Sequence, residues 1–312
     1  MGKVNLDALI PREDFEVKDV PDNTGGRNIP AISINELKEG SFFFSYIRKP
    51  DFQRETSEWD AEKICGLIDS FVAGDLIPAI ILWKNSGTYT FVIDGAHRLS
   101  ALAAWVNDDY GDGKISRNFF GSTPEEQIAI AGKTRTLVNK TVGSYADFQL
   151  ATTRPDKVRV DIVTRARNLG VLAVQLQWVY GDAQKAENSF FKINQEASPI
   201  DDTEFSLLKA RKQPNGLYAR AIIRSGKGHK YWSKFETAKQ SMIESLAQSV
   251  NDVLFAPPYK TPLKTLDLPI AGKKNSSRAS ALILDFVNMV NKVGKDTQLP
   301  PDQDGEKTIE FL

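Results

Sequence analysis

The sequence predicts an α+β fold that continues into a mostly helical C-terminal region. Residues 61–106 carry the patterns of a helix, two strands and a second helix, in that order. Helices are indicated by apolar residues at three- and four-residue spacing, and strands by β-branched or aromatic runs. With 312 residues, of which 41% are hydrophobic and 26% charged, the chain is large enough for one large globular domain or two ordinary ones.

Three regions are expected along the chain. Residues 1–30 are rich in charged residues, Pro, Asn and Gly, which predicts an arm or a loosely packed lead-in. Residues 31–215 contain the strand and helix patterns and form the predicted core. Residues 216–312 form the helical region, which is also basic.

The first half of the predicted core is built from short apolar segments. The aromatic run Phe42–Ile47 predicts a strand. Asp60 is a typical helix cap, and the apolar stripe after it predicts a helix over 61–73 that ends at Gly74. The apolar run Ile77–Trp83 predicts a buried strand beside the strand that ends at Ile93.

The second half of the core has weaker patterns. A short helix is expected over Pro124–Ala131 and a strand over Val158–Val163. The segment Leu169–Tyr180 is apolar on several faces, which indicates a helix packed in the interior.

The most informative stretch runs from Tyr89 to Trp105. It predicts a strand, a tight turn at Asp94-Gly95 and a helix. The turn brings Asp94, His97 and Arg98 to a helix N-terminus whose first N–H groups have no partner within the helix, which suits an anion such as phosphate. Alternatively, Asp94 is only a helix cap in an ordinary turn.

The sequence predicts neither a metal site nor an internal disulfide. Cys65 is the single cysteine, so it forms no internal disulfide, and with only two histidines no Cys/His zinc cluster is expected. Asp108, Asp112 and Gly113 fit part of a calcium loop, but Phe119 occupies the place of the bidentate acid. The segment is interpreted as a turn, and no metal is expected.

Zero formal net charge conceals a gradient. Residues 1–112 hold 11 Lys/Arg and 19 Asp/Glu, whereas residues 205–280 hold 14 and 4. A basic segment of this kind is typical of a polyanion site, although a solvated basic face is the alternative. The cations nearest to aromatic or glycine-bearing sequence, expected to contact DNA phosphates, are Arg224, Lys227, Lys230 and Lys273.

Three stretches resemble one known family. The Asp94–Arg98 motif resembles the signature of the ParB/sulfiredoxin-like superfamily, in particular the branch of the GmrSD N-terminal domain. Phe52-Gln53-Arg54 followed by Trp59 is similar to that branch's Tyr-Gln-Arg segment, and Phe190–Asn194 to its Phe-x-x-Ile-Asn segment. Ala96 stands where sulfiredoxins carry cysteine, so sulfiredoxin chemistry is excluded.

The resemblance implies a ParB/sulfiredoxin-like core and a set of site residues. Asp94, His97 and Arg98 are the expected catalytic residues. The expected substrate-binding residues are Gln53, Arg54, Gly95 and Asn194. For Asn194 the alternative is an amide that satisfies loop backbone.

The family is tied to defence against foreign DNA, so a DNA-acting hydrolase is expected, with phage or modified DNA as partner. We favour metal-free base excision by a DNA glycosylase, because one carboxylate and a donor suffice for an N-glycosidic bond. The alternatives are a switch that hydrolyses a nucleoside triphosphate with Mg²⁺, a DNA nickase, and a non-catalytic reader of modified DNA.

Targeting signals are also missing from the sequence. The N-terminus lacks an apolar signal core, and no run approaches the roughly 18 apolar residues of a membrane span. A cytoplasmic protein without a membrane partner is expected.

Overall fold

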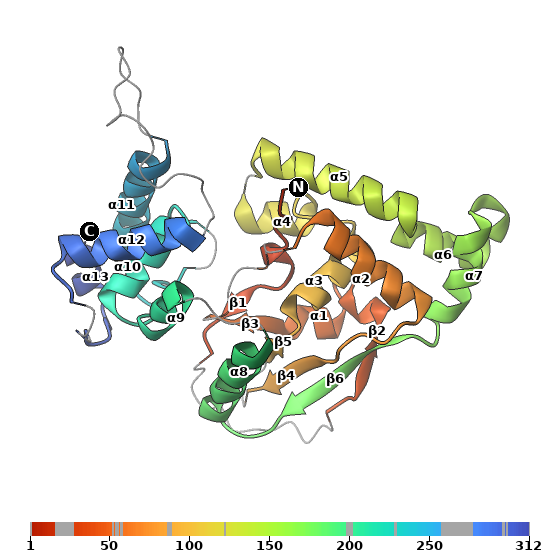
Figure 1. Cartoon of the computed structure of the whole chain (residues 1–312), viewed down its shortest axis with the longest axis horizontal. Coiled ribbons are helices and arrows are strands. Elements are labelled where there is room, and N and C mark those ends of the chain that lie inside the picture. The colour runs from red at the N-terminus through yellow and green to blue at the C-terminus, as the bar shows by residue number, and fades with distance from the viewer. Residues whose placement is uncertain are drawn as a thin grey trace, which may run out of the picture. The chain divides into compact units, whose positions relative to one another are not determined.

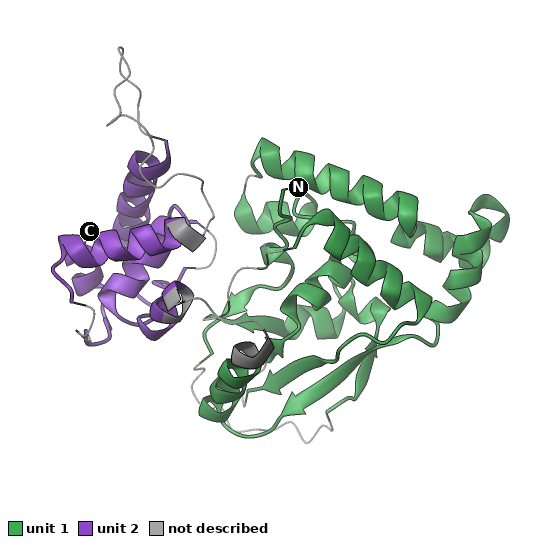
Figure 2. Ribbon diagram, viewed as in Figure 1, with its two compact units in different colours: residues 1–197 green, residues 198–312 purple. Residues whose placement is uncertain are grey.

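The computed structural model divides the chain into two compact units, residues 1–197 and 198–312 (Figure 2). The sequence placed its boundary later, between residues 215 and 216. Each unit is described by itself. The structure describes residues 2–15, 28–51, 53, 56, 59–85, 89–121, 123–197, 202–227, 230–256, 277–294, 297 and 299–311.

A six-stranded sheet forms the centre of the first unit (Figure 1). Its order is β1-β3-β5-β4-β6-β2. The pairs β1–β3, β3–β5 and β4–β6 are parallel, and β5–β4 and β6–β2 are antiparallel. The strands are β1 (Arg12–Glu13), β2 (Ala31–Ser33), β3 (Ile47–Pro50), β4 (Ile80–Lys84), β5 (Thr90–Asp94) and β6 (Ala173–Val179).

Because of the strand directions, the ends of five strands lie at one edge of the sheet. Because β1, β3 and β5 are parallel, their carboxyl ends lie together. Because β4 runs antiparallel to β5, and β6 parallel to β4, the amino ends of β4 and β6 lie at the same edge. The Asp94-Gly95 turn leaves the sheet at this edge.

Helix α3 begins directly after the Asp94-Gly95 turn. Helices α2 and α3 pack against each other, and α2 also packs against α5. The core includes Ile64, Ile68, Leu99 and Leu102 from α2 and α3. The helices of this unit are η1 (Asp7–Leu9), η2 (Ile34–Leu37), α1 (Phe42–Tyr46), α2 (Ala61–Ala73), α3 (Ala96–Asn107), α4 (Lys114–Phe120), α5 (Glu125–Thr141), α6 (Tyr145–Thr153), η3 (Pro155–Lys157), α7 (Val160–Leu169) and α8 (Ala183–Ala197).

The N-terminal residues pack into this core. Val4, Leu6 and Ile10 are buried, and the backbone N–H groups of Val4 and Leu6 donate to the carbonyl oxygens of Trp59 and Thr56, at 2.8 and 2.9 Å. The sequence suggested an arm or loosely packed lead-in over residues 1–30, whereas its described residues 2–15 form part of the core.

Several predicted elements agree with the structure. Helix α2 has the expected bounds, with Asp60 as its N-cap and Gly74 as its left-handed C-cap. Strands β4 and β5 are antiparallel neighbours, as expected, although β4 begins only at Ile80. The helix expected over Pro124–Ala131 is present but longer, ending at Thr141.

Three predicted elements are wrong. Residues 42–46 form helix α1 instead of a strand, because the Ser41 hydroxyl caps it by accepting from Phe44 N–H. Residues 160–169 form helix α7 instead of a strand. The segment expected as an interior helix contains β6, in which Val174 and Leu176 are buried and Gln175 and Gln177 are exposed.

The second unit is helical, as predicted. Its core gathers Leu217, Ile222 and Trp232 with residues of the later helices. Helix α10 packs against α11 and α12. The helices of this unit are α9 (Asp202–Lys209), α10 (Pro214–Ile223), α11 (Thr237–Phe255), α12 (Ser277–Val290) and α13 (Glu306–Glu310).

Candidate functional site

The turn between β5 and α3 requires a glycine. Gly95 is the N-cap of α3 and has φ of 91°, in the left-handed region that favours glycine. A Cβ there would meet Ile80 Cδ1 at 2.6 Å and Arg98 Nη2 at 2.9 Å. The missing side chain therefore gives the Arg98 guanidinium room to lie across the turn.

Asp94 and Arg98 form an ion pair over this glycine. Arg98 Nη2 lies 2.8 Å from Asp94 Oδ2 and donates a second hydrogen bond to the Ala79 carbonyl oxygen at 3.2 Å. The two side chains keep 33% and 19% exposure, Asp94 having the larger value. In the described part of the chain, Arg98 Nε is buried without a hydrogen-bond partner. The pair is held in place and partly open to solvent.

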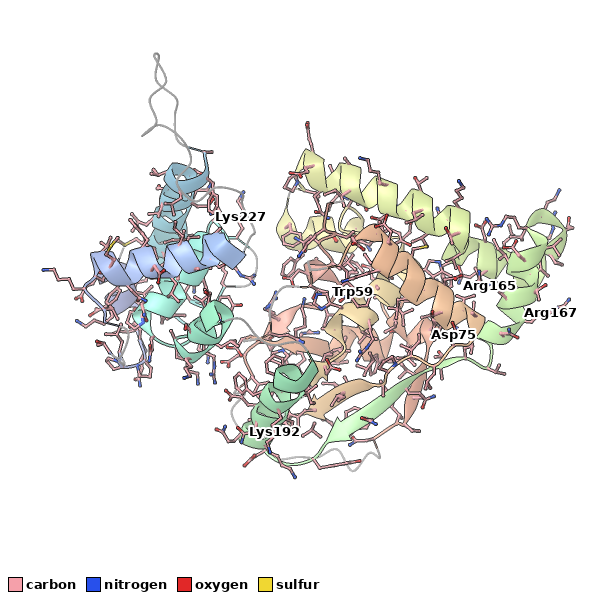
Figure 3. The ribbon with its side chains drawn as sticks, in the orientation of Figure 1. Trp59, Asp75, Arg165, Arg167, Lys192 and Lys227 are labelled. Carbon is pink, nitrogen blue, oxygen red and sulfur yellow. The ribbon has the colours of Figure 1, made fainter. Side chains whose placement is uncertain are left out.

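The His97 side chain contacts Trp59. Its ring stacks on Trp59, with centroids 5.7 Å apart and planes 25° apart. Trp59 precedes α2 and is itself half-buried; Figure 3 labels it. The sequence identified Trp59 as part of a family-like segment, and the structure adds its contact with His97.

Gln53 of the Phe-Gln-Arg segment follows β3, which ends at the same edge of the sheet. Ile47 pairs with Thr90 and Arg48 with Phe91 in parallel register, so the segment after β3 begins beside the Asp94 turn. Gln53 Oε1 is buried and has no hydrogen-bond partner within the described ranges. Arg54 lies outside the described residues.

A buried ionic cluster anchors this segment, and sequence reasoning missed it. Asp7 pairs with Arg12 and with Lys49, whose Nζ lies 2.7 Å from Asp7 Oδ1 and 3.0 Å from Thr56 Oγ1. Arg12 Nε donates to the Gln53 carbonyl oxygen at 3.1 Å. One charged residue, Asp7, inside the apolar stretch Val4–Ile10 was the available signal, but the stretch was assigned to a loose arm.

Asn194 lies in helix α8, which contacts β5 and β6. Its side chain is outside the described part of the structure. The expected role in substrate binding therefore stays a prediction.

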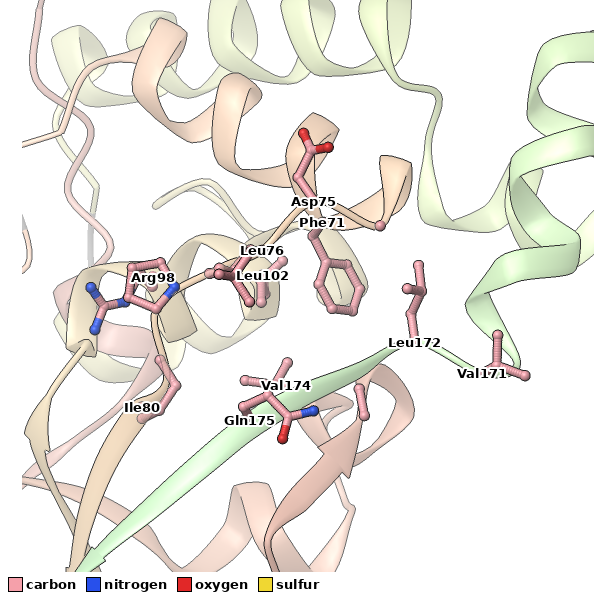
Figure 4. A pocket seen from close by; sticks show the side chains of 14 residues that line it. Phe71, Asp75, Leu76, Ile80, Arg98, Leu102, Val171, Leu172, Val174 and Gln175 are labelled. Carbon is pink, nitrogen blue, oxygen red and sulfur yellow. The ribbon is translucent and has the colours of Figure 1, made fainter.

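A pocket of about 290 Å³ opens beside Arg98 (Figure 4). It lies between the end of α2, the 74–78 loop, α3 and the start of β6. Arg98 reaches it, whereas Asp94 and His97 are not among its lining residues. Arg98 is thus shared between the pocket and the carboxylate.

The acidic segment that was tested as a calcium loop is a turn, as interpreted. Arg135 binds Asp108 Oδ1 and Asp112 Oδ1, each at 2.7 Å. These hydrogen bonds, that to Asp112 first, raise the pKa of the Arg135 guanidinium. Within the described residues there is no cluster of three or more His, Cys, Asp or Glu side chains suited to a metal ion.

The basic segment of the second unit is only partly open. Arg224 lies over the Tyr231 ring at 5.3 Å, and Lys230 pairs with Glu244 at 2.7 Å. Trp232 is buried, so it offers no face to a base. Lys227 is exposed (Figure 3), and Lys273 lies outside the described residues.

Comparison with known proteins gives one match. The family model described as "GmrSD restriction endonuclease, N-terminal domain" matches residues 34–213, which are 180 of the 312 residues. No curated protein and no solved structure matches. Among the described residues, each helix is too short or too polar to cross a bilayer.

Proposed function

Because the chain belongs to the GmrSD restriction endonuclease N-terminal domain family, we propose that it is a hydrolase of anti-phage defence that excises a base from foreign or modified DNA. The family assignment carries a restriction-type role directed at DNA. The choice of an N-glycosidic bond, and of phage or modified DNA as the target, is our proposal.

One observation carries it: the carboxylate of Asp94, one-third exposed, lies near a small pocket with the Arg98 guanidinium between them. Base excision needs a carboxylate near C1′, a donor for the departing base and space for that base. Asp94 at the end of β5 and, in the first turn of α3, His97 and Arg98 supply these functions. This set of groups needs no metal ion for the proposed step.

The proposed step adds water across the bond between C1′ and the base nitrogen. The carbon–nitrogen bond breaks and its electron pair leaves with the base. Asp94 stabilises positive charge at C1′ and orients water, whose hydroxyl bonds to C1′. A proton from His97 reaches the base, and His97 regains one from the water, so atoms and charge balance. Arg98 holds Asp94 in position through their ion pair.

The remaining site residues are proposed to bind substrate. Gln53 follows β3 at the edge where Asp94 leaves β5, Arg54 is proposed from the family resemblance, and Gly95 is proposed to bring backbone close to the ligand. Asn194 is proposed to contact the nucleotide through its amide. Substrate binding by these four residues is a proposal.

Alkali-sensitive abasic sites test the reaction. DNAs of differing base modification are incubated with the whole chain, with and without chelator, and then treated with alkali. We expect strand breaks only after alkali, unchanged by chelator, and lost in Asp94→Asn. The control Asp161→Asn changes an exposed, ion-paired aspartate on α7 and should keep full activity. Breaks without alkali, or full activity in Asp94→Asn, would contradict the proposal.

DNA binding by the second unit is tested separately through salt. We propose phosphate contacts from Arg224, Lys227, Lys230 and Lys273. Lys227→Gln should lower the slope of log affinity against log salt by about one, because each contact releases about 0.9 counterion on duplex DNA. Lys192→Gln, on α8 of the first unit, is the control. Equal slopes in both variants would mean that Lys227 is only a solvated cation.

One feature favours a second candidate, a switch that hydrolyses a nucleoside triphosphate with Mg²⁺. Helix α3 begins at a glycine without a side-chain cap and carries no acid in its first turn, an arrangement that suits phosphate. Release of inorganic phosphate from ATP or GTP that chelator stops, together with no abasic sites, would favour the switch over base excision.

A further inference from the structure

The pocket beside Arg98 has an apolar interior formed by elements far apart in the sequence. Phe71 from α2, Leu102 from α3, and Ile80 and Val174 from β4 and β6 line it, and all four are buried (Figure 4). Its lining residues all lie in the described part of the first unit.

The mouth of this pocket is apolar as well. Leu76 is 96% exposed and Val171 is 85% exposed, and both line the pocket, from the 74–78 loop and from the segment before β6. Large aliphatic side chains this exposed gain nothing from the fold, and grouped around a concave site they indicate a ligand that covers them. Asp75 and Gln175 stand at the same mouth and add polar contacts.

Arg98 provides a polar end to the apolar interior. Its Nη2 is taken by Asp94 and the Ala79 carbonyl. Among the described residues these are its hydrogen bonds, so Nη1 keeps its donors for a ligand acceptor. The positive charge of Arg98 is already matched by Asp94. The pocket therefore suits a neutral acceptor edge better than an additional anion.

The volume of the pocket also favours a small neutral ligand. At about 290 Å³ the pocket is at the lower limit of small-molecule sites, which hold roughly 300–1,000 Å³. A single heterocyclic base fits such a space, whereas a nucleoside triphosphate would need more room and more unmatched cations. We infer that this pocket holds one nucleobase, with its ring between Phe71 and Leu102 and an acceptor edge on Arg98.

The inference rests on the proposed function, because it gives the excised base a place beside Asp94. Arg98 then contacts the base and the carboxylate at once. The apolar mouth at Leu76 and Val171 becomes the region that senses the size of substituents on the ring.

Binding of deoxynucleosides to the whole chain tests the inference without requiring turnover. Calorimetric titrations use the four deoxynucleosides, with 2-deoxyribose 5-phosphate and ATP as competitors. The double variant Leu76→Ser/Val171→Ser removes the apolar mouth without touching the buried core. Val160→Ser, at a valine that is 82% exposed on α7 and outside the pocket, is the matched control.

We expect at least one deoxynucleoside to bind, its affinity to fall at least tenfold in the double variant, and Val160→Ser to bind like the unmodified chain. Deoxyribose phosphate should not compete. No deoxynucleoside binding, equal affinity in the double variant, or displacement by deoxyribose phosphate would overturn the inference. So would an ATP affinity that exceeds every deoxynucleoside's and falls in the double variant.

The two proposals fail separately. Binding that depends on Leu76 and Val171, without abasic sites in any DNA, would leave the base pocket standing and refute base excision. Abasic sites that depend on Asp94, with binding unchanged in the double variant, would keep base excision and refute this pocket.

Discussion

Helix α3 has an aspartate- and glycine-bearing turn at each end, and the two turns use the same residue types in opposite ways. At its start, Asp94 is one-third exposed and bonds to Arg98. After its end, Asp109 is buried and accepts hydrogen bonds from the N–H groups of Gly111, Gly113 and Ser116 and from the Ser116 hydroxyl, between 2.6 and 3.1 Å. The turn at Asp94-Gly95, called the open turn below, leaves polar groups accessible to a ligand. In the turn after α3, called the closed turn, the Asp109 carboxylate is fully used in hydrogen bonds within the fold.

The same contrast separates the two arginines. Arg135 bridges Asp108 and Asp112 through four hydrogen bonds. Arg98 makes two, both from Nη2. The turn after α3 holds more carboxylates than the Asp94-Gly95 turn, so the number of carboxylates alone would favour it as a functional site. The number of hydrogen bonds that the arginine makes within the protein is the more useful criterion, because Arg98 makes fewer than Arg135.

Asp109→Asn gives the largest expected change in stability. The variant loses the charge and places an amide donor against backbone donors, so the free energy of unfolding should fall by about 3 kcal/mol. Asp94→Asn should change it by less than about 1 kcal/mol, since Asp94 is partly exposed. Urea denaturation of both variants measures the difference. Equal losses would remove the contrast between the turns.

Gly95→Ala tests the open turn through its backbone. The left-handed φ and the close approach of Ile80 should cost about 2 kcal/mol. Gly66→Ala, in the middle of α2 where a Cβ meets nothing within 4 Å, should instead stabilise by up to about 1 kcal/mol. Thermal unfolding of the two variants should therefore shift in opposite directions, and a shift in the same direction would contradict the assigned strain.

Tyr110 makes the closed turn sensitive to alkali. Burial, followed by the charge of Asp108, raises the pKa of its phenol above the ordinary value of 10.0. In the unfolded chain the phenol ionises near that value, so this stabilisation is complete below pH 10 and falls by up to about 1.4 kcal/mol per pH unit above it. Denaturation series at pH 9 to 11 should show a steeper loss than in Tyr110→Phe. Parallel losses would show that the phenol is not protected.

The arginines give the smallest expected effects. Arg135→Gln should cost about 1 kcal/mol because two carboxylates lose their partner, one of them mostly buried. Arg98→Gln should cost about half as much, yet lower base excision and deoxynucleoside affinity. Denaturation and binding are measured on the same samples. A stability loss in Arg98→Gln as large as in Arg135→Gln would make Arg98 a structural residue.

The sequence predicted the site's local structure better than the rest of the sheet. The strand, turn and helix around Asp94 follow from strong local signals: β-branched residues, Asp-Gly and apolar spacing. Helix α1 was mistaken for a strand because aromatic residues favour strands, yet Phe42 is exposed and only Phe44 of the helix is buried. The Ser41 cap favours the helix over a strand in this segment.

Strand β6 was missed for a different reason. Its alternation of Gln175 and Gln177 with buried Val174 and Leu176 is visible in the sequence, but the apolar residues around it also fit a buried helix. The Asp7–Lys49 contact joins residues 42 positions apart, and no local pattern reports such a pairing. The pocket beside Arg98 likewise depends on three distant segments, so only the fold could locate it.

The buried cluster around Asp7 also sets an order of events during synthesis. Residues 4–12 are translated before their partners Lys49, Thr56 and Trp59, and Asp7 and Lys49 lie 42 positions apart. Until those partners emerge, the early segment carries its apolar and charged side chains without a place to pack, because the contacts are non-local. We expect residues 4–12 to dock late, and the position of Gln53 to be established only after Arg12 has reached its carbonyl oxygen.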